Sequence, residues 1–181
     1  FKPFRVEQLL GTVEQSVTNL GDVAMMLDLP AGQKFFPSET VTLRQVLDRG
    51  QPWRADPNAE VLFLGDSFAN IYSLEAMRWG GAAGLAEHLS LALGLPVDAI
   101  LRNDAGSHAT REMLAADLAR GRNRLAGKKI VIWEFASREL AFGDWKMTSL
   151  ELGEKRESGD IYAPAPGASV EIRGVVRGAS A

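Results

Sequence analysis

The chain has 181 residues, of which 46% are hydrophobic, and its formal net charge is −3 at pH 7. This composition is typical of one globular core, and it lacks the basic footprint of a nucleic-acid-binding protein. The absence of Cys excludes thiol and disulfide chemistry, and two His are too few for a histidine-rich metal site. No apolar stretch approaches the roughly 20 residues of a membrane-spanning helix.

The first sixty residues predict a loop-rich segment. Turns are indicated by four residues, Pro30, Gly32, Gly50 and Pro52. Between these turns, residues 42–47 form one short apolar-periodic stretch. We therefore expect this segment to be the N-terminal part of a domain whose core comes later in the chain.

Three short apolar runs have the length and composition of buried strands, at residues 61–64, 97–101 and 130–133. Between them, residues 74–93 and 110–125 carry apolar side chains at helical spacing. This alternation predicts an α/β fold in which a parallel sheet is flanked by helices.

The pattern fades after residue 150. Residues 163–167 resemble a linker, and residues 169–176 alternate weakly like an edge strand. We therefore divide the chain into an N-terminal part at 1–60, an α/β core at 61–150, and a C-terminal extension or linker to a following β element at 151–181.

The triplet Gly65-Asp66-Ser67 follows the first predicted strand. Ligands of parallel α/β sheets bind at the carboxyl ends of the strands, where this triplet lies. Gly65 permits a tight turn, and Ser67 is expected near the start of the next helix, whose dipole favours a developing alkoxide. The alternative is a plain helix cap, with no chemistry attached.

Two further segments end at the same edge of the predicted sheet. Gly106 follows the second strand and can present its N–H as an oxyanion donor, although a loop glycine is the simpler alternative. Arg138 follows the third strand as a positive group, or as one half of a rim ion pair with Glu139. The joint position of these residues on three strand ends favours a site.

A serine nucleophile needs a base, and the chain has two histidines. His88 lies within a predicted helix and is interpreted as a packing or surface residue. His108 follows Gly106 and is the candidate base for Ser67, or else a residue that only borders the cleft. Asp66 is expected to anchor the turn through backbone N–H groups.

Three ordered motifs, FLGDSFANIYS, NDAGSHATREML and VIWEFASREL, resemble the SGNH hydrolase superfamily. Within it, they are most similar to the SGNH-like domain of the periplasmic alginate O-acetyltransferases, over roughly residues 20 to 150. The resemblance implies an SGNH hydrolase-like (flavodoxin-like) fold. It also implies that Ser67 is the nucleophile and that the N–H groups of Ser67 and Gly106 form the oxyanion hole.

The chain departs from the simpler pattern of this superfamily. An ordinary SGNH esterase carries Asp and His in a C-terminal D-x-x-H block, but this chain has no His after His108. The acetyltransferase-like branch carries them upstream in a D-x-H motif, which does not occur in residues 1–64. We therefore expect an incomplete fragment that begins after this motif and lacks the catalytic Asp and His.

The resemblance implies an enzyme of the periplasm that needs no cofactor. Its acetyl group would pass through acetyl-Ser67 onto a uronic-acid exopolysaccharide in alginate biosynthesis. A membrane-bound acyltransferase and the polysaccharide secretion machinery would be its partners. The alternatives are a polysaccharide O-acetyl esterase and a non-catalytic carbohydrate-binding or assembly module of the same fold.

Several side chains are expected to contact the substrate. Tyr72, Arg138 and Asp66 are the candidate substrate-binding residues, and Arg138 is expected to meet polymer carboxylates together with Arg111. In addition, two tryptophans, Trp79 and Trp145, are expected to offer a ring face to a sugar, whereas Trp133 is expected in the core.

Overall fold

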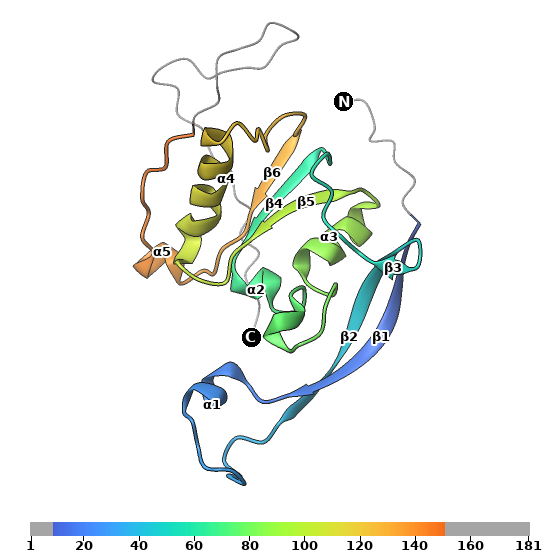
Figure 1. The fold of residues 1–181 in the computed structure, drawn as a ribbon, viewed down its shortest axis with the longest axis vertical. Coiled ribbons are helices and arrows are strands. Elements are labelled where there is room, and N and C mark those ends of the chain that lie inside the picture. Colours follow the sequence, from blue (N-terminus) through green and yellow to red (C-terminus); the bar gives the residue numbers. More distant parts are fainter. Residues whose placement is uncertain (1–8, 151–181) are drawn as a thin grey trace, which may run out of the picture.

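The structure is a computed structural model that describes residues 9–150 and contains two sheets (Figure 1). The antiparallel sheet consists of β1 (Leu10–Asn19), β2 (Glu39–Asp48) and β3 (Gln51–Pro52). The parallel sheet consists of β4 (Val61–Gly65), β5 (Val97–Leu101) and β6 (Ile130–Trp133). The helices are α1 (Asp22–Met26), α2 (Ser67–Asn70), η1 (Glu75–Met77), α3 (Leu85–Leu93), η2 (Gly106–His108), α4 (Ala109–Ala119) and α5 (Glu139–Phe142).

The parallel sheet has the strand order β5-β4-β6, so β4 lies at its centre. This is the order 2-1-3 with which flavodoxin-like sheets begin. The helical segment from α2 to α3 connects β4 to β5, and α4 connects β5 to β6 (Figure 1). The predicted α/β class, with a parallel sheet flanked by helices, is confirmed.

Side chains of β4 alternate between two hydrophobic clusters. Val61 and Phe63 pack in one cluster with Ala86 of α3, whereas Leu62 and Leu64 pack in the other with residues of α4. All five residues of β4 are buried. Because both faces of the strand are covered, its sequence is a continuous apolar run instead of an alternating one.

The prediction of a loop-rich segment before residue 61 is wrong for β1 and β2, which form a long hairpin. Strands β1 and β2 pair over ten residues each, from Leu10 opposite Asp48 to Asn19 opposite Glu39. Seven of the ten residues of β1 are exposed, and hydroxyl pairs such as Thr18 with Thr40 join the two strands. This hairpin depends on pairing between distant residues, so no apolar pattern within β1 announces it.

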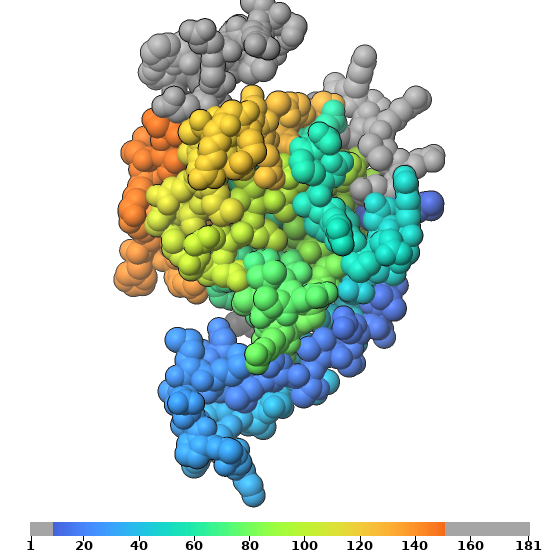
Figure 2. Space-filling model, viewed as in Figure 1, coloured from blue at the N-terminus to red at the C-terminus, as the bar shows by residue number. Residues whose placement is uncertain are grey.

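The hairpin projects away from the parallel sheet, and α1 lies near its far end (Figures 1 and 2). Its near end is joined to the core, because Val46 and Trp53 belong to the same buried cluster as Phe63. The peptide N–H of Val46 also donates to the carbonyl of Ala82, at 2.7 Å. The hairpin is therefore anchored at its base.

Two predicted helices are shorter in the structure than the sequence pattern indicates. The helix expected at 74–93 begins only at Leu85, because Gly80, Gly81 and Gly84 interrupt the segment before it. The helix expected at 110–125 occupies Ala109–Ala119. The chain then turns, and Arg124 leaves the helical path.

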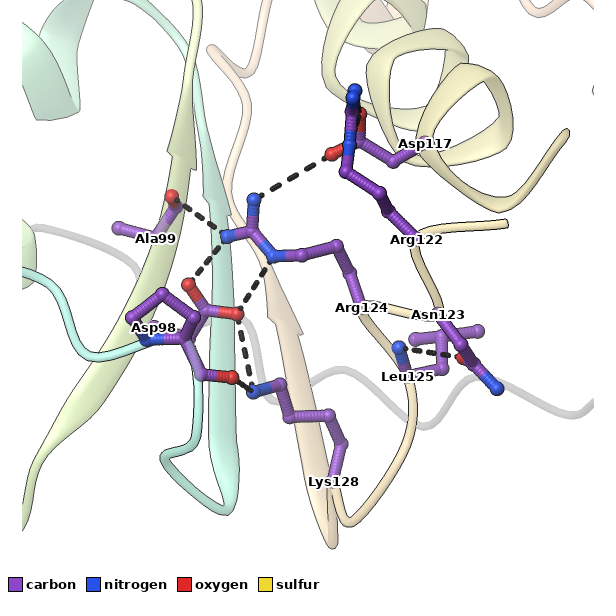
Figure 3. A network of polar contacts seen from close by, with 9 residues as sticks. Asp98, Ala99, Asp117, Arg122, Asn123, Arg124, Leu125 and Lys128 are labelled. Atoms are coloured by element: carbon purple, nitrogen blue, oxygen red, sulfur yellow. Dashed lines mark hydrogen bonds and ion pairs between the residues drawn. The ribbon is translucent and has the colours of Figure 1, made fainter. Parts of the chain in front are cut away.

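Asp98 of β5 is fully buried and binds two cations (Figure 3). Arg124 Nε donates to Asp98 Oδ2 at 3.1 Å, and its Nη2 also bonds the carboxylate. Lys128 Nζ lies 3.1 Å from the same Oδ2 and donates to the carbonyls of Pro57 and Ala59. The network joins the α4–β6 connection to the amino-terminal ends of β5 and β4.

The whole predicted extension at 151–181 lies outside the described residues. It includes the linker predicted at 163–167 and the edge strand predicted at 169–176. The division of the chain into three parts stays a prediction.

We predict that Asp98→Ala lowers the free energy of unfolding by about 3–5 kcal/mol, because it leaves the Arg124 and Lys128 cations buried without their anion. Urea denaturation followed by circular dichroism measures this change. The matched control is Asp104→Ala, which removes an exposed carboxylate paired with Arg102 and should cost about 0–1 kcal/mol. Equal losses in the two variants would contradict the structural role of Asp98.

Candidate functional site at the carboxyl ends of the parallel strands

Ser67 is the first residue of α2, directly after the end of the central strand β4. The turn is tight because Gly65 is packed closely. A Cβ at Gly65 would lie 2.6 Å from the Phe63 ring and 2.7 Å from Ala69 Cβ. Ser67 is half-buried, and Phe68 beside it is exposed. The serine hydroxyl makes no hydrogen bond to any residue in the described range 9–150.

Asp66 holds this turn through backbone N–H groups, as predicted. Its Oδ1 accepts the N–H of Phe68 at 2.8 Å, which caps α2, and its Oδ2 accepts the N–H of Ala136 at 2.9 Å. In return, Glu134 Oε2 accepts the N–H of Asp66 at 3.0 Å. Because both Asp66 oxygens already accept hydrogen bonds, its expected contact with substrate stays a prediction.

The loop after β5 forms the second side of the site. Gly106 has φ +67°, in the left-handed region that favours glycine, and begins η2. The N–H of Ser107 donates to Glu139 Oε2 at 3.1 Å. Asn70 of α2 donates to Asn103 Oδ1 at 2.6 Å, which ties this loop to the helix that carries the serine.

Two backbone donors at this edge remain available. Across residues 9–150, the N–H groups of Ser67 and Gly106 donate to no acceptor. They are the groups to which the sequence resemblance assigns the oxyanion hole. Free N–H groups at a helix start and at a glycine turn can stabilise a developing negative charge.

Neither histidine forms a hydrogen bond with Ser67. His88 Nε2 lies 2.9 Å from the carbonyl oxygen of Arg44, which agrees with a packing role in α3. His108 is buried, and its Nε2 lies 4.0 Å from Glu112 Oε2. Its Nδ1 has no partner among the described residues. The role of His108 as a base stays a prediction.

Arg138 lies beside the nucleophile turn, with its guanidinium carbon 5.3 Å from the centre of the Phe68 ring. Its side chain is 62% exposed, and the predicted ion pair with Glu139 has an N–O distance of 3.9 Å. Arg111 is used within the fold, because its guanidinium stacks on Trp133 at 4.6 Å and donates to the carbonyl of Lys146. Tyr72 is half-buried just after α2.

Trp79, which was expected to stack on a sugar, is buried. Trp145 is 42% exposed, but its ring meets Trp133 and Phe135 edge to face, at 5.6 and 5.2 Å. Its Nε1 donates to the carbonyl of Glu139 at 2.8 Å. Trp133 is half-buried within this aromatic group, at the margin of the core where it was expected.

Two glutamates of the segment after β6, Glu134 and Glu139, belong to the site and were not predicted from the sequence. The signal that identifies Glu134 is its position directly after a strand of the parallel sheet, which is also where Asp66 lies. Nothing local to the sequence shows that Glu139 reaches the glycine turn.

Burial raises the pKa of Glu134 above its ordinary value, and the neighbouring Asp66 carboxylate raises it further. The N–H of Asp66 acts in the opposite direction, because it stabilises the ionised form. Within the described residues, no Lys, Arg or His side chain forms an ion pair with Glu134.

No group of three His, Cys, Asp or Glu side chains able to hold a metal ion occurs between residues 9 and 150. In the same range, no helix has the length and apolar character that crossing a membrane requires.

Comparison with solved structures identifies the fold. The O-acetyltransferase domain of Pseudomonas putida AlgJ is similar with a TM-score of 0.50 and 19% sequence identity, over 76% of this chain and 43% of that chain. The chain thus spans less than half of the solved AlgJ chain. Its fold is SGNH-like.

A second structure, Pseudomonas aeruginosa AlgX, has a TM-score of 0.45 and 14% identity, over 72% of this chain and 27% of AlgX. No protein-family model matches the chain, and no curated protein matches it. The SGNH-like fold predicted from the three motifs is confirmed by the likeness to the AlgJ domain.

We predict that Glu134→Gln changes how stability depends on pH. A carboxyl whose pKa is raised by folding binds a proton more readily in the folded state, so it contributes stability at low pH that is lost as pH rises through the folded pKa. Glu134→Gln removes this dependence. The stability of the variant relative to wild type should therefore increase as the pH rises from acid to neutral.

Thermal unfolding of both proteins across pH 4 to 8 measures this difference. The control is Glu14→Gln on exposed β1, which should follow the wild-type curve. A constant offset between Glu134→Gln and wild type at every pH would contradict the assignment.

Proposed function

We propose that the chain carries the serine nucleophile of an O-acetyltransferase, which moves an acetyl group through acetyl-Ser67 onto a hydroxyl of a uronic-acid exopolysaccharide. The observation that carries this proposal is the placement of Ser67. It follows the central parallel strand, starts a helix, and lies on a turn that Asp66 caps. The likeness of the fold to an O-acetyltransferase domain supports it.

The proposed reaction has two steps. Ser67 Oγ attacks the carbonyl carbon of an acetyl donor while a base takes its proton, and the base then gives this proton to the donor's leaving group as the bond to that group breaks. A sugar hydroxyl next attacks the acetyl carbon while the base takes its proton, and the base returns the proton to Ser67 Oγ as the bond between Ser67 Oγ and the acetyl carbon breaks. The N–H groups of Ser67 and Gly106 stabilise the negative oxygen in both steps.

The base is proposed to be a His held by an Asp of the D-x-H motif, which does not occur in residues 1–64. The protein is proposed to work in the periplasm and to receive its acetyl group from a membrane-bound acyltransferase. The polysaccharide secretion machinery is proposed as a further partner. An acetyl esterase of the same fold would use the same acyl-serine with water as acceptor. Comparing product formed with and without an acceptor oligosaccharide separates these two activities.

A second candidate function is a non-catalytic carbohydrate-binding or assembly module. It is favoured by one observation, that neither His88 nor His108 forms a hydrogen bond with Ser67. Such a module would bind polysaccharide and would not become acetylated.

We predict that p-nitrophenyl acetate adds one acetyl group to the chain slowly, and that added imidazole accelerates this reaction because it replaces a missing base. Ser67→Ala should abolish the acetylation, as measured by intact mass and by peptide mapping. The matched control is Ser137→Ala, an exposed serine after β6, which should label like wild type. Equal labelling of wild type and Ser67→Ala would refute Ser67 as the nucleophile.

We also predict that Phe68→Ala and Arg138→Ala each weaken binding of a uronic-acid oligosaccharide by about threefold to tenfold. The exposed ring offers an apolar face to the sugar, and the guanidinium can pair with its carboxylate. Titration calorimetry with charged and neutral oligosaccharides measures the effect. The loss in Arg138→Ala should be confined to the charged ligand. Arg120→Ala, an exposed arginine at the end of α4, is the control.

A further inference from the structure

The segment after β6 sends one carboxylate to each of the other two segments of the site. Glu134 Oε2 accepts the N–H of Asp66, the residue before the nucleophile, at 3.0 Å. Glu139 Oε2 accepts the N–H of Ser107, the residue after the glycine donor, at 3.1 Å. Each carboxylate therefore binds the peptide group adjacent to a free N–H of the site.

The contact with the nucleophile turn is reciprocal. Asp66 Oδ2 accepts the N–H of Ala136 while Glu134 accepts the N–H of Asp66, so two hydrogen bonds of 2.9 and 3.0 Å join the end of β4 to the segment after β6. Hydrogen bonds to charged acceptors are stronger than those between neutral groups. The turn that carries Ser67 is consequently held from two directions.

The contact with the glycine turn is close. A Cβ placed on Gly106 would lie 3.0 Å from Glu139 Oε2, so only a glycine leaves full room for this carboxylate. Glu139 is 14% exposed at the start of α5. Its own backbone is braced, because its carbonyl accepts both the N–H of Gly143 and the indole N–H of Trp145, at 2.8 Å each.

Holding Glu134 here carries an energetic cost. The side chain is half-buried next to Asp66 and has no paired cation among residues 9–150. Burial of a carboxylate beside another carboxylate disfavours its ionised form. A neutral apolar residue after β6 would avoid this cost but would leave the N–H of Asp66 without an acceptor.

We propose that Glu134 and Glu139 are positioning residues that together set the spacing between the Ser67 hydroxyl and the Gly106 N–H. This inference rests on the proposed function, since it assigns those two groups to one reaction. One short segment, from the end of β6 to α5, then acts as the reference to which both reacting turns are attached. Displacement of either turn by about an ångström is enough to slow an acyl transfer strongly.

The test combines amide hydrogen exchange with single-turnover acetylation. Glu134→Ala, Glu139→Ala, the two Gln variants and the control Glu14→Ala are compared with wild type by NMR. We expect the Asp66 amide to lose protection only in Glu134→Ala and the Ser107 amide only in Glu139→Ala. The Gln variants, which keep an acceptor oxygen, should retain both, and amides of α4 should not change.

In single-turnover acetylation by p-nitrophenyl acetate, each Ala variant should lower the maximal rate at Ser67 by about tenfold or more, with little change in the half-saturating ester concentration. Each Gln variant should recover to within about threefold of wild type. A purely structural role would lower stability throughout the protein. It would not lower the maximal acetylation rate while leaving the half-saturating ester concentration unchanged.

Ala variants that acetylate at the wild-type rate would overturn the proposal. If those variants do not fold, the test is made on wild type and the Gln variants. The proposal is then overturned if the Asp66 and Ser107 amides of folded wild type exchange as fast as exposed backbone. A wild-type protein that is never acetylated removes the proposed function instead. Selective amide protection, lost in each Ala variant and kept in its Gln partner, then still supports the positioning role.

Discussion

The buried carboxylate of Asp98 constrains the whole parallel sheet. It lies on β5 beside Leu62 of the central strand, and Arg124 and Lys128 form ion pairs with it there (Figure 3). Both cations belong to the connection between α4 and β6, which crosses from β5 to the far side of β4. Satisfying one charge therefore fixes where β6 enters the sheet, and with it the register of the segment that follows β6.

Charge is used differently at the two ends of the sheet. At the amino-terminal ends, Lys128 is almost fully buried and its charge is met by Asp98 and by backbone carbonyls. At the carboxyl ends, the partners of the Asp66 and Glu134 carboxylates within residues 9–150 are backbone N–H groups. The first arrangement pairs opposite charges with one another. The second lies at the switch point between β4 and β6, where the strand order reverses and ligands of such sheets bind.

Local patterns in the sequence were sufficient for those parts of the fold that depend on local burial. The positions of the three strands of the parallel sheet were predicted from their continuous apolar runs. Only the central strand β4 is buried along its whole length, and the expectation of a buried strand at residues 130–133 is wrong, because β6 lies at an edge of the sheet with Ile130 and Val131 exposed. The turn at Ser67 and the anchoring role of Asp66 were predicted because strand ends and caps follow local rules. The hairpin of β1 and β2 and the reach of Glu139 to Ser107 were missed, since both depend on partners about 30 residues away.

The two glutamates place carboxylates around a site that is proposed to stabilise a negative oxygen. Arg138 is the nearby group that offsets this, because it pairs with Glu139 at 3.9 Å and lies over the ring of Phe68. The long, exposed ion pair is weak, so the guanidinium is not committed to Glu139. An acceptor carboxylate that drew Arg138 toward the substrate would leave Glu139 bound to the Ser107 N–H alone. Binding of an anionic acceptor would then strengthen the carboxylate's hold on the glycine turn at the moment when the oxyanion has to form.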